Sequence, residues 1–206
     1  NGISRRPATY SITGTGSLRI QQPAALSLYI EAESAQFAGN WLVTSSDDGA
    51  YGDYLLGDNS GNGNDATFVI AVALEGNYSV WVRSRDFDTY VGQRRFKVGV
   101  DGVLFPFEAG AHGANGWQWE CVGTTALTAQ DHVITLKDIS QYYPRCDALY
   151  LTTTAVNPNQ RTFTQLNAAA VKPRTVAFRN LDSPNGVLLR FSAEAEVTNN
   201  FRSLTG

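Results

Sequence analysis

The chain has 206 residues, of which 43% are hydrophobic and 11% aromatic, so it can bury a core and is not a globally disordered polypeptide. Charged residues make up 17%, and the formal net charge of −3 excludes the basic surplus that general nucleic-acid binding requires. No apolar run approaches the roughly 20 residues of a membrane-spanning helix, so no membrane span is expected.

Residues 1–27 form an N-terminal segment interrupted by Pro, Gly, Ser and Thr. Alternating stretches at 10–13 and 17–21 predict one or two strands, and Pro23 ends them. The chain lacks Met and begins Asn-Gly-Ile-Ser, so we expect that a signal peptide or a longer polypeptide preceded it. This start and the composition favour a secreted protein, located outside the cell or at its surface.

Residues 28–155 alternate between short strand patterns and turns. The first strand, 27–33, ends in the carboxylates Glu31 and Glu33, and turn-forming residues dominate 39–65. Further strands are predicted at 66–74, 78–85, 96–100, 103–105, 118–122, 132–136 and 148–152. The dipeptide Asp101-Gly102 predicts a two-residue hairpin turn. Many short strands without a long helical period predict an all-β protein, an antiparallel β-sandwich.

Residues 156–206 differ in character from the main body. Three strands are predicted in this region, at 161–166, 175–180 and 187–197. A hairpin turn at 183–186 joins the last two. Three strands are too few for an independent core. We therefore expect a β extension that packs on the main domain, on the N-terminal strands or on a neighbouring subunit.

Cys121 and Cys146 are the only cysteines, and each lies at the edge of a predicted strand. They are either two buried thiols or a disulfide between neighbouring strands, which an extracellular setting would favour. Two cysteines without a nearby His make a poor zinc site.

Five stretches occur in an order and at a spacing that resemble a known family. They are IEAE at 30–33, YSVWVR at 78–83, FKVGVDG at 96–102, GWQW at 116–119 and RCDALYLT at 145–152. Together they resemble the galactose-binding-like β-jelly-roll modules that include carbohydrate-binding module families 6 and 35, as found in accessory domains of xanthan-lyase-like and other polysaccharide-degrading bacterial proteins. The resemblance covers residues 28–155. It implies a jelly roll, with strand-forming extensions at both ends, that is secreted, non-catalytic and binds a glycan.

The same resemblance implies a structural Ca²⁺ site. The positions that match the family's ligands are Glu31, Glu33 and Asp147. Two residues apart on one strand, Glu31 and Glu33 would point to the same face, and carboxylate oxygens suit Ca²⁺. The alternative is that they are solvated acids on an edge strand.

Sugar recognition requires aromatic faces for stacking and polar groups for the hydroxyls. The candidate carbohydrate contacts lie in or beside predicted loops: Trp117, Tyr142, Tyr143, Tyr90, Arg85, Asp86 and Trp41. Trp117 could equally belong to the core together with Trp119, which lies on the same strand face.

Two other function classes remain open. Strand-forming extensions beyond a complete jelly roll are what strand exchange in an extracellular fibre, sheath or surface layer would use, with the chain as its own partner in a homopolymer. A polysaccharide-active enzyme is less well supported. Asp86 and Asp88 could form a carboxylate pair, but His112 and His132 suit structural roles, and common catalytic motifs are absent from the sequence.

Overall fold

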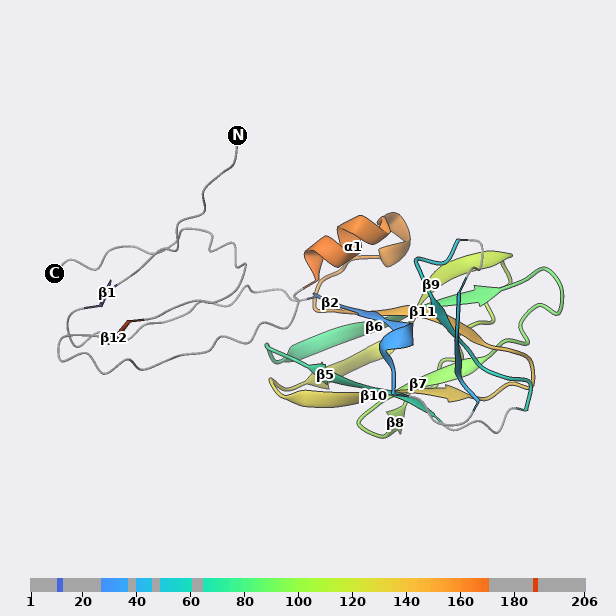
Figure 1. The fold of residues 1–206 in the computed structure, drawn as a ribbon, viewed down its shortest axis with the longest axis horizontal. Helices are drawn as coiled ribbons and strands as arrows, with labels where there is room; N and C mark the ends of the chain where they lie inside the picture. Colours follow the sequence, from blue (N-terminus) through green and yellow to red (C-terminus); the bar gives the residue numbers. More distant parts are fainter. Residues whose placement is uncertain are drawn as a thin grey trace. The chain divides into compact units, whose positions relative to one another are not determined.

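The structure, a computed structural model, describes residues 11–12, 27–36, 40–45, 49–60, 65–170 and 187–188 (Figure 1). The chain divides into two compact units, residues 1–21 with 173–206, and residues 22–172. The predicted strands at 17–21 and 175–180, and the predicted turn at 183–186, lie outside the described residues. The larger unit contains the predicted module and extends beyond residue 155.

The smaller unit pairs the two ends of the chain. Strand β1 (Ser11–Ile12) is antiparallel to β12 (Val187–Leu188), with Ser11 opposite Leu188 and Ile12 opposite Val187. Two residues of the N-terminal extension therefore pair with two residues of the C-terminal extension within one chain.

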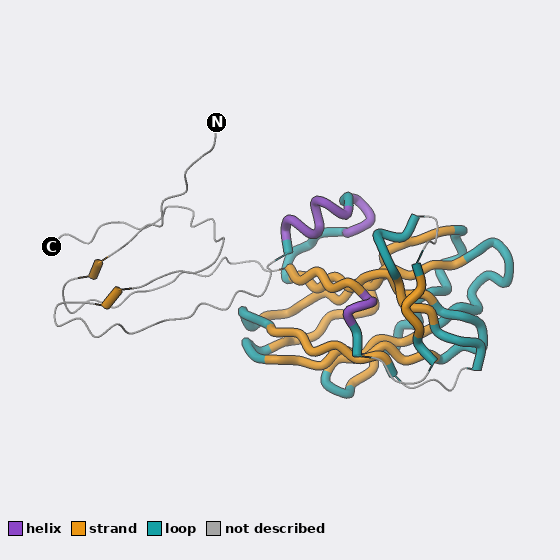
Figure 2. The backbone as a smooth tube through the Cα atoms, viewed as in Figure 1, coloured by secondary structure: helices purple, strands orange, loops and turns teal. Residues whose placement is uncertain are grey.

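The larger unit is a sandwich of two antiparallel sheets (Figures 1 and 2). One sheet has the order β5 (Ala66–Ala71), β10 (Asp131–Asp138), β7 (Phe96–Val100) and β8 (Val103–Leu104). The other has the order β3 (Leu42–Thr44), β4 (Tyr54–Leu56), β11 (Arg145–Thr152), β6 (Gly76–Asp86) and β9 (Gly116–Leu127), and β2 (Ser27–Glu31) also pairs with β11. This confirms the predicted all-β, antiparallel sandwich.

The core lies between the two sheets because alternate residues of strands such as β10 turn inward. In β10, Ile134 and Leu136 are fully buried, while Val133 and Lys137 are exposed. Strand β11 differs, since its residues from Cys146 onward are all buried. It is therefore covered on both faces.

The first strand is shorter than predicted. Strand β2 ends at Glu31, and a 3₁₀ turn, η1 (Ala32–Ser34), follows, with the amide of Ala35 donating to the carbonyl of Ala32. The prediction that Glu31 and Glu33 alternate on one strand is therefore wrong.

The predicted strand at 161–166 is also wrong, because the segment forms the helix α1 (Phe163–Ala169) after the 3₁₀ turn η2 (Pro158–Gln160). Thr162 and Gln165 form a reciprocal capping box that starts the helix, and this local bonding outweighs the strand-like pattern. The ring of Phe163 packs against Tyr29 of β2 at a centroid distance of 5.6 Å. Figure 2 shows the helix lying over the sheet. None of the helices in the described ranges has the length and apolarity needed to cross a membrane.

The predicted disulfide is not formed. Cys121 and Cys146 are free thiols, the first exposed and the second buried. Cys121 lies on β9 and Cys146 on β11, with β6 between them. Two strand spacings are about 9.5 Å, more than the Cα separation that a disulfide bridges.

Docking of α1 is testable at Leu166, whose side chain is 1% exposed and packs with Trp119 and Tyr150. Leu166→Ala should lower the free energy of unfolding by about 2–5 kcal/mol, because it removes buried methyl groups and leaves a cavity. Urea denaturation measures the change, with the exposed Thr164→Ala as the matched helix control. Equal stability of the two variants would contradict the docking of the helix.

Candidate functional site

One end of the sandwich gathers several loops. Residues 87–95 join β6 to β7, residues 105–115 lead from β8 into β9, and residues 139–144 join β10 to β11. The strand register places Asp86 beside Gly116, and Asp138 beside Phe96, so these loops leave the same end of the two sheets.

Three tyrosines from two of these loops contact one another. The ring centroids of Tyr90 and Tyr142 are 5.0 Å apart, and those of Tyr142 and Tyr143 are 5.9 Å apart. Tyr90 is 56% and Tyr143 40% exposed, so aromatic surface faces solvent. Both have a left-handed backbone, with φ of 55° and 50°, a strained conformation that is uncommon in a non-glycine residue. We call Tyr90, Tyr142 and Tyr143 the tyrosine platform.

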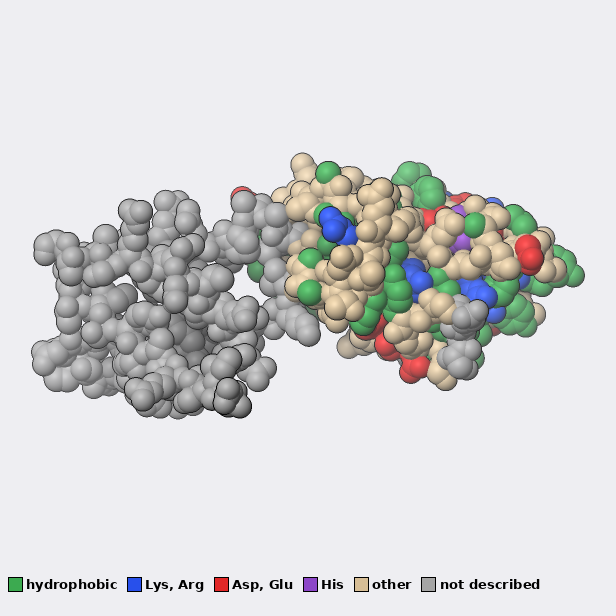
Figure 3. Space-filling model, turned by 90° about the horizontal axis from the view of Figure 1, so that it is seen from above, with side chains coloured by type: hydrophobic (Ala, Val, Ile, Leu, Met, Phe, Trp, Pro, Cys, Tyr) green, Lys and Arg blue, Asp and Glu red, His purple; other side chains and the backbone are tan. Residues whose placement is uncertain are grey.

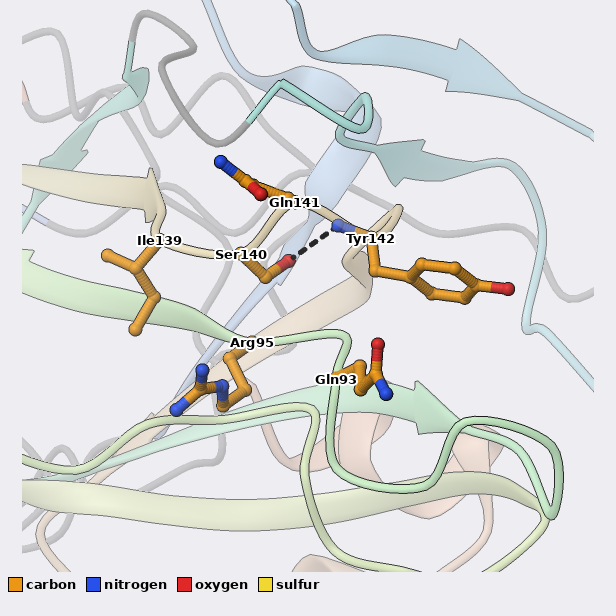
Figure 4. A pocket seen from close by; sticks show the side chains of 6 residues that line it. All are labelled: Gln93, Arg95, Ile139, Ser140, Gln141 and Tyr142. Carbon is orange, nitrogen blue, oxygen red and sulfur yellow. Dashed lines mark hydrogen bonds between the residues drawn. The ribbon is translucent and has the colours of Figure 1, made fainter.

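A pocket of about 400 Å³ adjoins the platform (Figure 4). Its lining comes from the 87–95 and 139–144 loops: Gln93, Arg95, Ile139, Ser140, Gln141 and Tyr142. Figure 4 shows Gln93 and Arg95 across the pocket from the segment that carries Gln141. Amide and guanidinium groups beside an aromatic ring can hydrogen-bond hydroxyls while the ring packs on an apolar face.

Two predicted contact residues do not reach the surface. Trp41 is 2% exposed and packs edge-on against Phe96 in the core, at a centroid distance of 6.1 Å. Asp86 is fully buried, and both of its carboxylate oxygens accept hydrogen bonds from the loops. Neither can touch a ligand in this structure, so both predictions are corrected. Both residues were predicted to be exposed because they lie in or beside predicted loops, but a loop residue can also turn its side chain into the core.

Trp117 and Arg85 lie in a neighbouring cluster. The ring of Trp117 packs against Tyr54 at 5.3 Å, and the guanidinium of Arg83 lies 5.4 Å from it. Arg85 lies 4.4 Å from the centroid of Phe87, on which Arg94 also packs. In the space-filling view, basic and hydrophobic side chains neighbour one another on the face seen from above (Figure 3).

Sequence reasoning missed Gln93, Arg94 and Arg95, which lie between Tyr90 and β7. Polar residues in a loop are usually solvated, so no signal in one sequence separates them from ordinary surface residues.

Asp147 lies at an irregularity of β11. The register with β6 shifts between Cys146 and Ala148, and here the opposite edge of β11 changes its partner from β4 to β2. A bulge of this kind redirects a side chain. The buried carboxylate of Asp147 accepts hydrogen bonds from the guanidinium of Arg83 and from the amide of Tyr51.

Glu31 and Glu33 lie close enough to Asp147 to interact with it electrostatically. Burial raises the pKa of Glu31 to about 7, and the charges of Glu33 and Asp147 add to this although a hydrogen bond from Tyr29 lowers it. Burial, and then the charge of Asp147, also raise the pKa of Glu33, and one of its carboxylate oxygens is buried without a hydrogen-bond partner. Three crowded carboxylates are a donor set that a hard cation would stabilise.

The fit to Ca²⁺ is partial. In the part of the chain that the structure describes, no three His, Cys, Asp or Glu side chains are arranged to hold a metal ion. Asp147 turns toward Arg83, which already supplies a positive charge. Glu31 and Glu33 remain available as oxygen ligands.

No family model and no curated protein matches the sequence. Among solved structures, a family 35 carbohydrate binding module from Clostridium thermocellum matches with a TM-score of 0.50 and 21% identity, over 61% of this chain and 98% of that one. A CBM35 from Paenibacillus barcinonensis matches with a TM-score of 0.51 and 16% identity, over 61% and 98%.

A GH26-CBM35 β-(1,4)-mannanase from Podospora anserina has a TM-score of 0.52 and 24% identity, over 64% of this chain but only 28% of the enzyme. At these identities the similarity concerns the fold. The chain therefore contains the β-jelly-roll fold of the family 35 carbohydrate-binding modules, and the predicted resemblance is confirmed at that level.

Proposed function

We propose that this protein is a secreted, non-catalytic module that binds an extracellular polysaccharide or glycan at the tyrosine platform and its adjoining pocket. The observation that carries the proposal is the grouping of three tyrosines, two of them strained and exposed, beside a pocket lined by Gln93, Arg95 and Gln141. The carbohydrate-binding modules that share the fold support the same class of function.

The chemistry of the site suits a sugar. An exposed tyrosine ring packs on the apolar face of a pyranose, and the amides of Gln93 and Gln141 can each donate to and accept from hydroxyls. The guanidinium of Arg95 adds hydrogen-bond donors in a fixed plane. One of them, Nη1, already forms an ion pair with Glu108, 2.9 Å from its carboxylate oxygen.

The glycan site is testable with two substitutions. Tyr90→Ala and Tyr142→Ala should each reduce affinity for the best ligand on a glycan array by about tenfold or more, which corresponds to about 1.4 kcal/mol of binding free energy. Affinity gels or calorimetry give the values. The reason is the loss of the ring that packs on the sugar.

Val91→Ala is the matched control, because Val91 is exposed in the same loop and lies outside the platform. Trp117→Ala should leave the affinity within about twofold, because the ring of Trp117 packs on Tyr54 and lies outside the platform. A wild-type protein that binds no glycan would refute the function. Loss of binding in Trp117→Ala alone would move the site to the Trp117 cluster.

We also propose a structural Ca²⁺ held by Glu31 and Glu33, which Asp147 would join as a third ligand by turning away from Arg83. In the metal-free protein, the raised pKa of Glu31 means that its stabilising contribution is complete below about pH 4.5 and is lost as the pH rises through about 7. A bound cation would take the place of the proton. Ca²⁺ should therefore stabilise the protein more at pH 8 than at pH 5.

At pH 8, saturating Ca²⁺ should raise the Tm by about 5 °C or more over that in a chelator. Glu31→Gln and Glu33→Gln should remove this shift, whereas Asp131→Asn, at an exposed position of β10, should retain it. Equal Tm values with chelator and with Ca²⁺ at both pH values would rule out the metal.

A second candidate function is assembly into an extracellular fibre, sheath or surface layer. The pairing of β1 with β12 favours it, since exchange of one of these strands between copies would form the same ladder. Negative-stain microscopy of the full chain across concentrations should then show polymers, and deletion of residues 1–26 should abolish them. A monomer at every concentration would exclude assembly.

A further inference from the structure

Asp86 is a fully buried carboxylate at the end of β6, where the chain enters the 87–95 loop. One of its oxygens accepts from the amide of Phe87 at 2.9 Å, and the other from the amides of Gly92 and Gly113, each at 3.0 Å. A buried carboxylate requires such donors to offset its desolvation. Here the donors come from the start and the middle of one loop and from a second loop, so one side chain fixes the two loops together.

Arg94 is the fourth donor and extends this network. Its Nη1 lies 3.3 Å from Asp86, 3.0 Å from the carbonyl of Thr89 and 3.2 Å from the carbonyl of Tyr90. The guanidinium is buried and lies 4.9 Å from the ring centroid of Tyr142, which belongs to a third loop. Arg94 therefore bonds the strained backbone of Tyr90 and supports the ring of Tyr142 at the same time.

We propose that the buried Asp86–Arg94 pair is the positioning element of the tyrosine platform. The pair touches no ligand itself. It acts through Tyr90 and Tyr142, whose backbone and ring it holds before the sugar arrives, so that binding does not have to order them. This inference rests on the proposed glycan-binding function and assigns to Asp86 a role that differs from the direct contact expected from its sequence position.

The same sheet contains a comparison pair that separates positioning from stability. Arg83 and Asp147 form a second buried ion pair, and Arg83, like Asp86, belongs to β6. The guanidinium of Arg83 packs over Tyr51 at 3.6 Å and bonds the carbonyl of Gly49. These contacts are with the 49–51 segment and not with the platform, so disturbing this pair should cost stability alone.

The experiment compares Asp86→Asn and Arg94→Lys with Arg83→Lys. Each Lys variant retains the charge and loses the planar guanidinium, which packs on Phe87 and Tyr142 in Arg94 and on Tyr51 in Arg83. Asp86→Asn and Arg94→Lys should weaken binding of the glycan preferred by the wild type by about tenfold or more. Arg83→Lys should lower the Tm by a similar amount to Arg94→Lys and change the affinity less than about twofold. An affinity loss that follows the Tm in all three variants would overturn the proposal.

Amide hydrogen exchange provides a readout that needs no ligand. In Asp86→Asn the amides of Gly92 and Gly113 should exchange about tenfold faster or more, while those of β11 remain protected. Unchanged exchange at both glycines would overturn the proposal. If Asp86→Asn does not fold, Arg94→Lys decides the question, since it keeps the carboxylate. A wild type that binds no glycan would refute the proposed function, and the exchange result would still decide whether Asp86 orders the loops.

Discussion

Strand β11 is the constraint on which the rest of the sandwich depends. It is hydrogen-bonded along one edge to β6, and along the other to β4 and then to β2. Leu149 and Leu151 face the core between the sheets, while Ala148 and Tyr150 lie under α1. Because both faces and both edges are covered, each residue of β11 must fit the packing on its face and keep its backbone hydrogen bonds to the adjacent strands. The bulge beside Asp147 is the one interruption in its register with β6, and a buried ion pair fills that position.

Two buried ion pairs, Arg83–Asp147 and Arg94–Asp86, connect β6 to different parts of the structure at this end of the sheet. Arg83 and Asp86 are three residues apart on β6, so their side chains leave opposite faces of the strand. Arg83 reaches the bulge of β11, and Asp86 reaches the loops. Breaking a buried pair by removing one partner costs about 3–5 kcal/mol. Strand β6 is therefore bonded to β11 through Arg83 and to the loops of the proposed binding site through Asp86. Both connections are buried, so solvent does not screen them.

Period-two alternation in the sequence predicted most of the strands, because a strand with one buried face must alternate. The hairpin at Asp101-Gly102 was equally readable, and both residues have the positive φ that such a turn requires. Helix α1 was missed, although Thr162 and Gln165 are a legible capping box, because seven residues are too few to establish a helical period. The sequence also placed Tyr142 and Tyr143 in a loop that presents them beside Tyr90.

The remaining features depend on contacts between distant residues. Asp86 bonds Gly113, and Asp147 bonds Arg83, across separations that no local pattern reveals. Glu31 and Glu33 illustrate the same limit at short range, since a 3₁₀ turn began where alternation suggested a continuing strand. From the sequence alone, a loop residue such as Arg94 is expected to be exposed to solvent. Only the structure shows that Asp86 and the carbonyls of Thr89 and Tyr90 hold it inside.

The two thiols have unequal chemical access. Cys121 is exposed, whereas Cys146 is buried, and burial followed by the charge of Asp147 raises the pKa of its thiol well above the ordinary range. Only the thiolate reacts with alkylating reagents, so the folded chain presents one reactive sulfur and withholds the other. Cys121 can therefore carry a probe or a surface tether at a defined strand, and the alkylation rate of Cys146 reports how often the centre of the sandwich opens.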